Sequence, residues 1–144
     1  MDYNVAFAIS KTGMSLEQLR LEVATQNLAQ MNQATRPGAS PYRPLRVVSS
    51  AQPMGFSNQM GVAAAQYAGV GPAAIVPMDV QPRTVQDPGH PYADQRGLVT
   101  YPGVDHAGEM INLMTAVRAY EANVVAFNMT KTMVQRALEI GGNT

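Results

Sequence analysis

MINLMTAVRAYEANVVAFNMTKTMVQRALEI, residues 110–140, is the stretch that decides the fold of this 144-residue chain. Its apolar residues recur in alternating steps of three and four, the spacing of a coiled-coil helix, and only Lys131 interrupts them. A second row repeats this rhythm on the far side, so the stretch predicts one long helix with two apolar faces. The first row is Met110, Leu113, Val117, Tyr120, Val124, Phe127, Val134 and Leu138, and the far row is Ala119, Ala122, Ala126, Met129 and Met133.

The N-terminal segment has the same double pattern. It predicts a helix from about Tyr3 to Met31, in which Gly13 is a weak point that costs about 1 kcal/mol relative to alanine. Two apolar rows lie about 150° apart around its axis, at roughly 3.5 residues per turn. The inner seam is Ile9, Leu16, Leu19 and Val23, with Thr12 and Gln26 as polar members, and the outer stripe is Phe7, Met14, Leu21 and Leu28.

Proline divides the chain into three segments. All ten prolines lie between residues 37 and 102, so the middle cannot be one helix while both ends can. Asp105 is a suitable N-cap for the last helix, and Gly141-Gly142 is a usual stop signal. The fold class is therefore mainly α with a small β insert: long terminal helices form a coiled-coil-like pair around an irregular β-rich middle. The predicted segments are 1–35, 36–104 and 105–144, with short strands within 45–49, 73–86 and 97–101.

Composition and motifs narrow the function classes. Ten basic and ten acidic residues cancel, which disfavours nucleic-acid binding, and the absence of cysteine excludes disulfides and thiol chemistry. No apolar run approaches the length of a membrane span, and no basic leader precedes an apolar core, so neither membrane insertion nor a cleavable signal peptide is expected. We expect no enzyme, cofactor or metal site. The clusters Asp87/His90/Asp94 and His106/Glu109 lack further ligands and are explained by a turn and by a helix start.

The helices carry more apolar surface than one chain can bury, which predicts assembly. A helical hairpin hides one seam per helix, and leaving the outer stripe in water forfeits roughly 6–12 kcal/mol, which is comparable to a domain's stability. The alternative is that both rows form the ordinary core of a monomeric hairpin with its insert. Polar amides along the helices are compatible with a solvated face or with hydrogen bonds between subunits. The predicted subunit interface is Phe7, Ile9, Met14, Leu16, Leu19, Leu21, Val23, Asn27, Leu28, Met110, Leu113, Val117, Tyr120, Asn123, Val124, Phe127, Met129, Met133, Val134 and Leu138.

Short motifs at both ends resemble one family. Residues 19–23 (LRLEV) and 27–29 (NLA), together with 118–123 (RAYEAN) and 138–141 (LEIG), are similar to the terminal signatures of bacterial flagellar rod and hook proteins. In the middle, 41–43 (PYR) and the stretch from 87–91 (DPGHP) to Asp105 resemble the proximal-rod branch of that family, whereas residues 50–85 match poorly. Gln30 departs from the pattern, since the family usually has a second asparagine there.

The resemblance implies a structural subunit of the flagellar basal body. Copies would pack helically as a proximal rod around the export channel and transmit torque. Expected partners are copies of itself, other rod proteins, the basal-body ring and the flagellar type III export apparatus, which would export the chain uncleaved into the periplasm-spanning rod. Phe56 to Met60 weakly resembles an export-gate element. Alternatives are another rod or hook paralogue, or a cytoplasmic helical-hairpin chaperone or adaptor.

Overall fold

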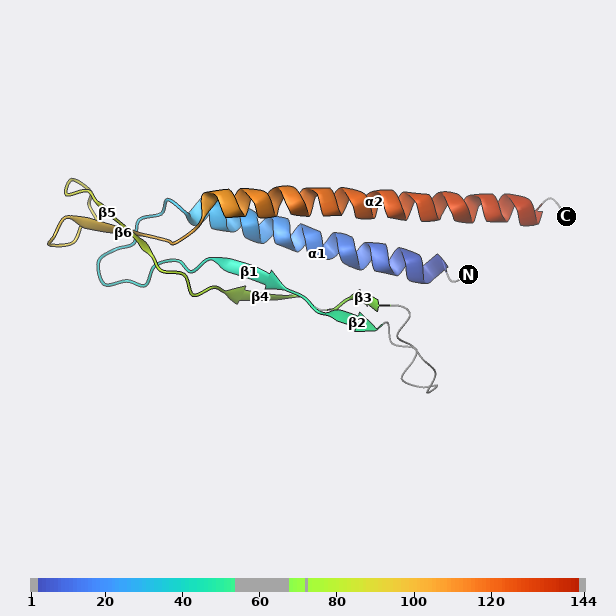
Figure 1. The fold of residues 1–144 in the computed structure, drawn as a ribbon, viewed down its shortest axis with the longest axis horizontal. Coiled ribbons are helices and arrows are strands. Elements are labelled where there is room, and N and C mark those ends of the chain that lie inside the picture. The colour runs from blue at the N-terminus through green and yellow to red at the C-terminus, as the bar shows by residue number, and fades with distance from the viewer. Residues whose placement is uncertain (1–2, 54–67, 72, 143–144) are drawn as a thin grey trace. The chain divides into compact units, whose positions relative to one another are not determined.

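The computed structural model describes residues 3–53, 68–71 and 73–142 of the chain. Within these ranges the chain forms two long helices, α1 and α2, and six short strands, which are labelled in Figure 1. The predicted combination of terminal helices with a small β insert is confirmed at this level. The element bounds are α1 (Tyr3–Gln30), β1 (Leu45–Val48), β2 (Ala51–Pro53), β3 (Ala68–Val70), β4 (Ala74–Pro77), β5 (Arg83–Gln86), β6 (Leu98–Tyr101) and α2 (His106–Gly142).

The helix boundaries follow local chemistry. α1 ends at Gln30, where turn hydrogen bonds such as Gln33 N–H to the Gln30 carbonyl (3.1 Å) replace the helical pattern. At the start of α2, Asp105 Oδ1 accepts a hydrogen bond from the backbone N–H of Ala107 at 3.1 Å. The Asp105 carbonyl accepts the first helical bond, from Glu109 N–H, at 2.9 Å. The prediction that Asp105 is the N-cap is confirmed.

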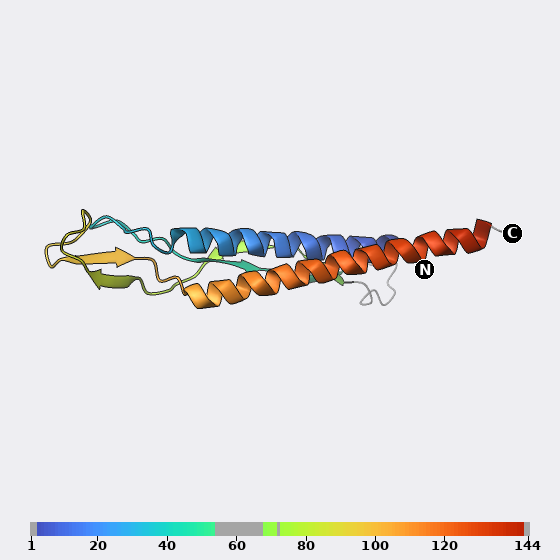
Figure 2. The ribbon, with the colours of Figure 1, turned by 90° about the horizontal axis from the view of Figure 1, so that it is seen from above.

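The strands form three two-stranded sheets: β1 pairs with β4, β2 with β3, and β5 with β6. The last two pairs are antiparallel, with Gln52 opposite Gly69 and Val85 opposite Val99. Figure 2 shows β5 and β6 side by side. Strands within 45–49, 73–86 and 97–101 were predicted, but β2 and β3 were not, because each has three residues and little apolar alternation. Prolines end β2 and β4, as expected for strands that are all sheet edges.

Asp94 organises the connection between β5 and β6. Its Oδ1 accepts backbone N–H bonds from Arg96 and Leu98, both at 2.8 Å, and Gly97 adopts a left-handed conformation with φ of 74°. These bonds, first that from Leu98 and then that from Arg96 together with the Arg96 charge, lower the pKa of the Asp94 carboxyl below its usual 3.8. His90 Nδ1 accepts the N–H of Tyr92 at 3.0 Å. The polar residues of this region therefore serve the turn.

The chain divides into two compact units, each of which combines parts of all three sequence segments. The first unit contains residues 1–19, 48–74 and 115–144, and the second contains 20–47 and 75–114. Among the described residues the buried apolar core is small: Leu16 and Ala116 lie in the first unit, and Val23, Ala24 and Val99 in the second. Over the described ranges, neither helix combines the length and hydropathy needed to cross a bilayer.

Candidate functional site

In the first unit, the start of α1 packs against α2. The rings of Phe7 and Phe127 lie with their centroids 4.8 Å apart and their planes tilted by 59°. Gly13 is buried beneath the side chain of Asn123. Tilted aromatic pairs at this separation contribute about 0.5–1.5 kcal/mol beyond the area they bury. Phe7 therefore has a partner within its own chain, and all four residues of the outer stripe, Phe7, Met14, Leu21 and Leu28, are partly buried.

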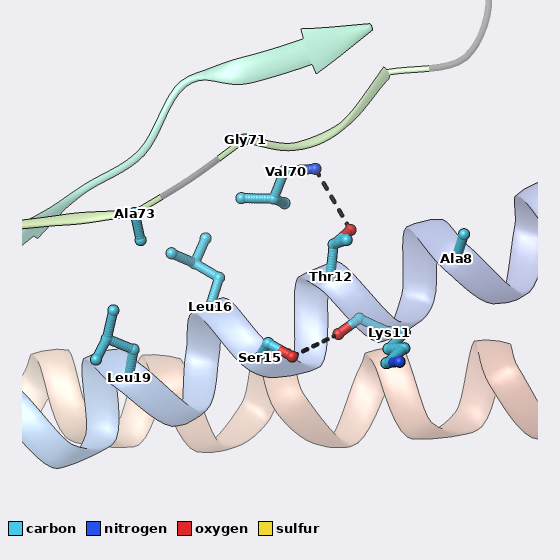
Figure 3. Close-up of a pocket in the computed structure, with 9 residues that line it drawn as sticks. All are labelled: Ala8, Lys11, Thr12, Ser15, Leu16, Leu19, Val70, Gly71 and Ala73. Atoms are coloured by element: carbon cyan, nitrogen blue, oxygen red, sulfur yellow. Dashed lines mark hydrogen bonds between the residues drawn. The ribbon is translucent and has the colours of Figure 1, made fainter. Parts of the chain in front are cut away.

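The inner seam of α1 faces the β insert instead. Figure 3 shows Thr12, Leu16 and Leu19 beside the chain around Val70 and Ala73, where they line an open groove of about 490 Å³. The Thr12 hydroxyl donates to the Ile9 carbonyl at 2.9 Å and accepts the Val70 N–H at a long 3.4 Å. Leu16 is only 8% exposed.

Both apolar rows of α1 are buried or partly buried within the single chain. Gly71 and Ala73 of the insert line the open groove together with Thr12, Leu16 and Leu19 of α1. Among the described residues of the two helices, the exposed large apolar side chains lie on α2.

In the second unit, Asn27 connects the end of α1 to β1. Its side chain is fully buried, with 0% exposure. Nδ2 donates to the Leu45 carbonyl, while Oδ1 accepts the Leu45 N–H and the Tyr42 hydroxyl, each at 2.9 Å. Buried amides are stable only when hydrogen-bonded, and this one is satisfied within the chain. We call this arrangement the Asn27 clamp.

Tyr42 is held in the protonated form that the clamp needs. Burial, and second the negative charge of Glu109, raise the pKa of its hydroxyl above the usual 10.0. A raised pKa means that the folded state favours the protonated hydroxyl. The stability that protonated Tyr42 contributes is therefore fully present below pH 10, and it is lost as the pH rises through the folded-state pKa. The phenol can therefore donate to Asn27 throughout the neutral range.

Among the described residues of the first unit, α2 carries a run of exposed apolar side chains. Val125, Met129 and Met133 follow one another at steps of four, and they are 57%, 63% and 56% exposed. With three polar neighbours they line a shallow hollow of about 440 Å³ in the first unit. Methionine side chains are flexible and adapt to irregular partners. This face, Val125, Asn128, Met129, Thr132, Met133 and Arg136, is called the α2 hollow below.

Comparison with known proteins supplies the family. Residues 95–140 match the family model "Flagellar basal body rod FlgEFG protein C-terminal". The chain is 35% identical over 135 residues to the flagellar basal-body rod protein FlgC of Escherichia coli O6:H1, covering 94% of this chain and 95% of the relative. It is also 35% identical to FlgC of Salmonella typhimurium, with the same coverage, and 34% identical to that of Bacillus subtilis, covering 92% and 94%.

The chain belongs to the FlgC family of flagellar basal-body rod proteins. The matches cover 92–94% of the chain, and so include most of residues 50–85, the part without a recognised family motif. The terminal and central motifs of the family also meet in space. Asn27 of the NLA motif binds Tyr42 of the PYR motif, and Asn123 of the RAYEAN motif packs on Gly13. Gln30, where the sequence departs from the family pattern, takes no part in the hydrogen bonds of the Asn27 clamp.

The residues predicted to form a subunit interface fall into three classes in the single chain. Leu16, Val23 and Asn27 are buried, and for Asn27 the chain itself provides the hydrogen-bond partners that we observe. Met110, Tyr120, Met129, Met133 and Leu138 are exposed, and the others are partly buried. Sequence analysis missed four further exposed apolar residues of α2: Ile111, Met114, Val125 and Ile140. The four-residue spacing of Val125, Met129 and Met133 is the signal that could have identified Val125.

Proposed function

We propose that this chain is a non-enzymatic structural subunit of the flagellar proximal rod. The observation that carries the proposal is the exposed apolar face of α2, in a chain that matches FlgC proteins over nearly their whole length. Exposed apolar patches of this kind are typical of interaction surfaces. α2 is the element that offers most of this surface to neighbouring subunits.

Within the rod, the terminal helices form a coiled-coil-like layer around the export channel. The exposed members of the predicted interface, above all Met129 and Met133, lie against other subunits. Partners are copies of itself, other rod proteins and the basal-body ring. A helical array of copies needs head-to-tail contacts between unlike surfaces, and adaptable methionines suit neighbours that are not identical. The β insert makes the lateral contacts that resist torsion, so that torque passes through the layer.

The export route is part of the same proposal. The chain reaches the periplasm-spanning rod through the flagellar type III apparatus, with its N-terminal segment uncleaved. The candidate export-gate element, Phe56 to Met60, lies outside the described residues, and its role remains a prediction from the sequence.

The test is to locate the chain in cells. A small epitope tag on the chain should copurify with detergent-resistant basal bodies, and electron microscopy with a tag-specific antibody should label the proximal rod. An untagged strain is the control for background labelling. A tagged chain that complements motility but stays in the soluble cytoplasmic fraction would contradict the proposal and favour a chaperone or adaptor.

A further inference from the structure

In the first unit, Gly13 of α1 lies directly against the side chain of Asn123 of α2. A Cβ atom built on Gly13 would lie 2.6 Å from Oδ1 of Asn123 and 3.0 Å from its Cγ. Real Cβ atoms essentially never come within 3.0 Å of a neighbour. The Asn123 amide therefore occupies the space that any other side chain at position 13 would need.

The Asn123 amide is also fixed from its own side. Its Nδ2 donates a hydrogen bond to the Ala119 carbonyl at 2.9 Å, one turn earlier in α2. Turning the amide away from Gly13 would break this bond. Glycine and asparagine are both poor helix formers, so neither is explained by the stability of its own helix. A packing role explains both together.

The heptad pattern alone does not select one alignment of α1 and α2. The outer stripe repeats every seventh residue, so sliding α1 by one heptad along α2 would restore similar apolar contacts. It would not restore the fit at Asn123, which would then face Ala6 or Arg20 in place of Gly13. Asn123 lies beside the apolar row, next to Val124, and a single polar residue at a helix contact is a known way to fix the register of a coiled coil.

We propose that Gly13 and Asn123 form a register key, which fixes the antiparallel alignment of α1 and α2. The second contact, Phe7 with Phe127, agrees with this alignment, because residue numbers rise along α1 as they fall along α2. The key selects one register of the two helices, which the repeating apolar residues cannot do by themselves.

The register also sets how far α2 projects beyond α1. Phe127 of α2 lies opposite Phe7 of α1. α1 begins at Tyr3, four residues before Phe7, whereas α2 continues past Phe127 to Gly142 (Figures 1 and 2). The projecting end is roughly 15 Å long at 1.5 Å per residue. It carries Leu138 and Ile140, which are 70% and 77% exposed. If the proposed rod function holds, the key thereby sets the reach of this end toward a neighbouring subunit.

Spin-label distances test the key in the purified full chain. The chain has no cysteine. The double variant Lys11→Cys/Gln135→Cys therefore carries a label at these two positions and nowhere else, and both positions are exposed. We expect one narrow distance distribution. Gly13→Leu should shift it by about 10 Å, the length of one heptad, or broaden it over that range. Adding Asn123→Ala should restore the narrow distribution, because it opens space for the new side chain.

The control is Gln18→Leu, which adds the same residue at an exposed position of α1 and should leave the distance unchanged. An unchanged distance in Gly13→Leu, or no recovery on adding Asn123→Ala, overturns the key. If Gly13→Leu loses its helix by circular dichroism, the deciding comparison is Gly13→Ala. The change in melting temperature caused by Gly13→Ala is measured in the unaltered chain and in the Asn123→Ala chain. It should be several degrees more favourable in the Asn123→Ala chain, and equal changes in the two chains overturn the key.

Motility separates this inference from the proposed function. In cells that depend on this chain, Gly13→Leu should be exported but non-motile, and Asn123→Ala should restore swimming. If the spin-label result holds while the unaltered chain is absent from basal bodies, the key stands and the rod function fails. If the chain is found in the rod and the spin-label result is negative, the rod function stands and the key fails.

Discussion

Among single residues, Asn27 is the one whose loss should lower the free energy of unfolding most clearly. Asn27→Ala leaves the Leu45 backbone groups and the Tyr42 hydroxyl without their buried partner, and each unsatisfied group costs about 1–3 kcal/mol. Tyr42→Phe removes one hydrogen bond and should cost only about 0.5–1.5 kcal/mol. Urea unfolding of the full chain measures both. Gln26→Ala, at an exposed neighbouring position, is the control, and an equal effect there would contradict the clamp.

Asp94 predicts a local response to acid. Because its pKa is lowered in the folded state, the carboxylate's contribution is present above the unfolded value of about 3.8 and is lost as the pH falls through the lower folded-state pKa. The amide resonances of Arg96 and Leu98 should therefore titrate together below about pH 3.8 in nuclear magnetic resonance spectra. Asp94→Asn keeps an acceptor oxygen without the charge, so it should abolish this titration. Titration at or above the ordinary carboxyl value would refute the assigned hydrogen bonds.

For whole elements, the sequence predicts what is encoded locally. Both helices and the Asp105 cap were predicted closely, because heptad spacing, proline placement and capping residues act over a few positions. β2 and β3 were missed, since three-residue strands of small residues pair only because the chain returns to them. Gly13 was recognised as a weak point of the helix. The residue that explains why a glycine stands there, Asn123, lies far away in sequence. The coverage of α1 by the insert was unpredictable for the same reason.

The start of α2 provides a prediction at this scale. Asp105→Ala removes the side-chain acceptor for the Ala107 N–H and should destabilise the chain by about 0.5–2 kcal/mol. Thermal unfolding followed by circular dichroism measures the loss. Asp79→Ala is a matched control, because its carboxylate is fully exposed and its contact with Arg43 is long, at 3.5 Å. A pair of this kind contributes little. Equal shifts for the two variants would show that the cap is dispensable.

For the whole molecule, the α2 hollow separates folding from assembly. Met129→Asp and Met133→Asp place charges where the single chain leaves the side chains 63% and 56% exposed, so its free energy of unfolding should change by less than about 0.5 kcal/mol. In a rod, the same charges would be buried against a neighbouring subunit without a partner, at a cost of several kcal/mol. We therefore expect normal export and helicity but no rod assembly and no swimming.

Gln135→Asp provides the control for these two variants. It adds the same charge at an exposed position of the same helix, more than 100° around the axis from Met129 and Met133 at 100° per residue. Soft-agar motility, counts of intact basal bodies by electron microscopy, and circular dichroism of the purified chains together read out assembly and folding. If Met129→Asp and Met133→Asp swim as well as Gln135→Asp, the α2 hollow faces solvent in the assembled structure. The excess apolar surface of this chain would then need another explanation, because the apolar rows of α1 are already buried or partly buried within the single chain.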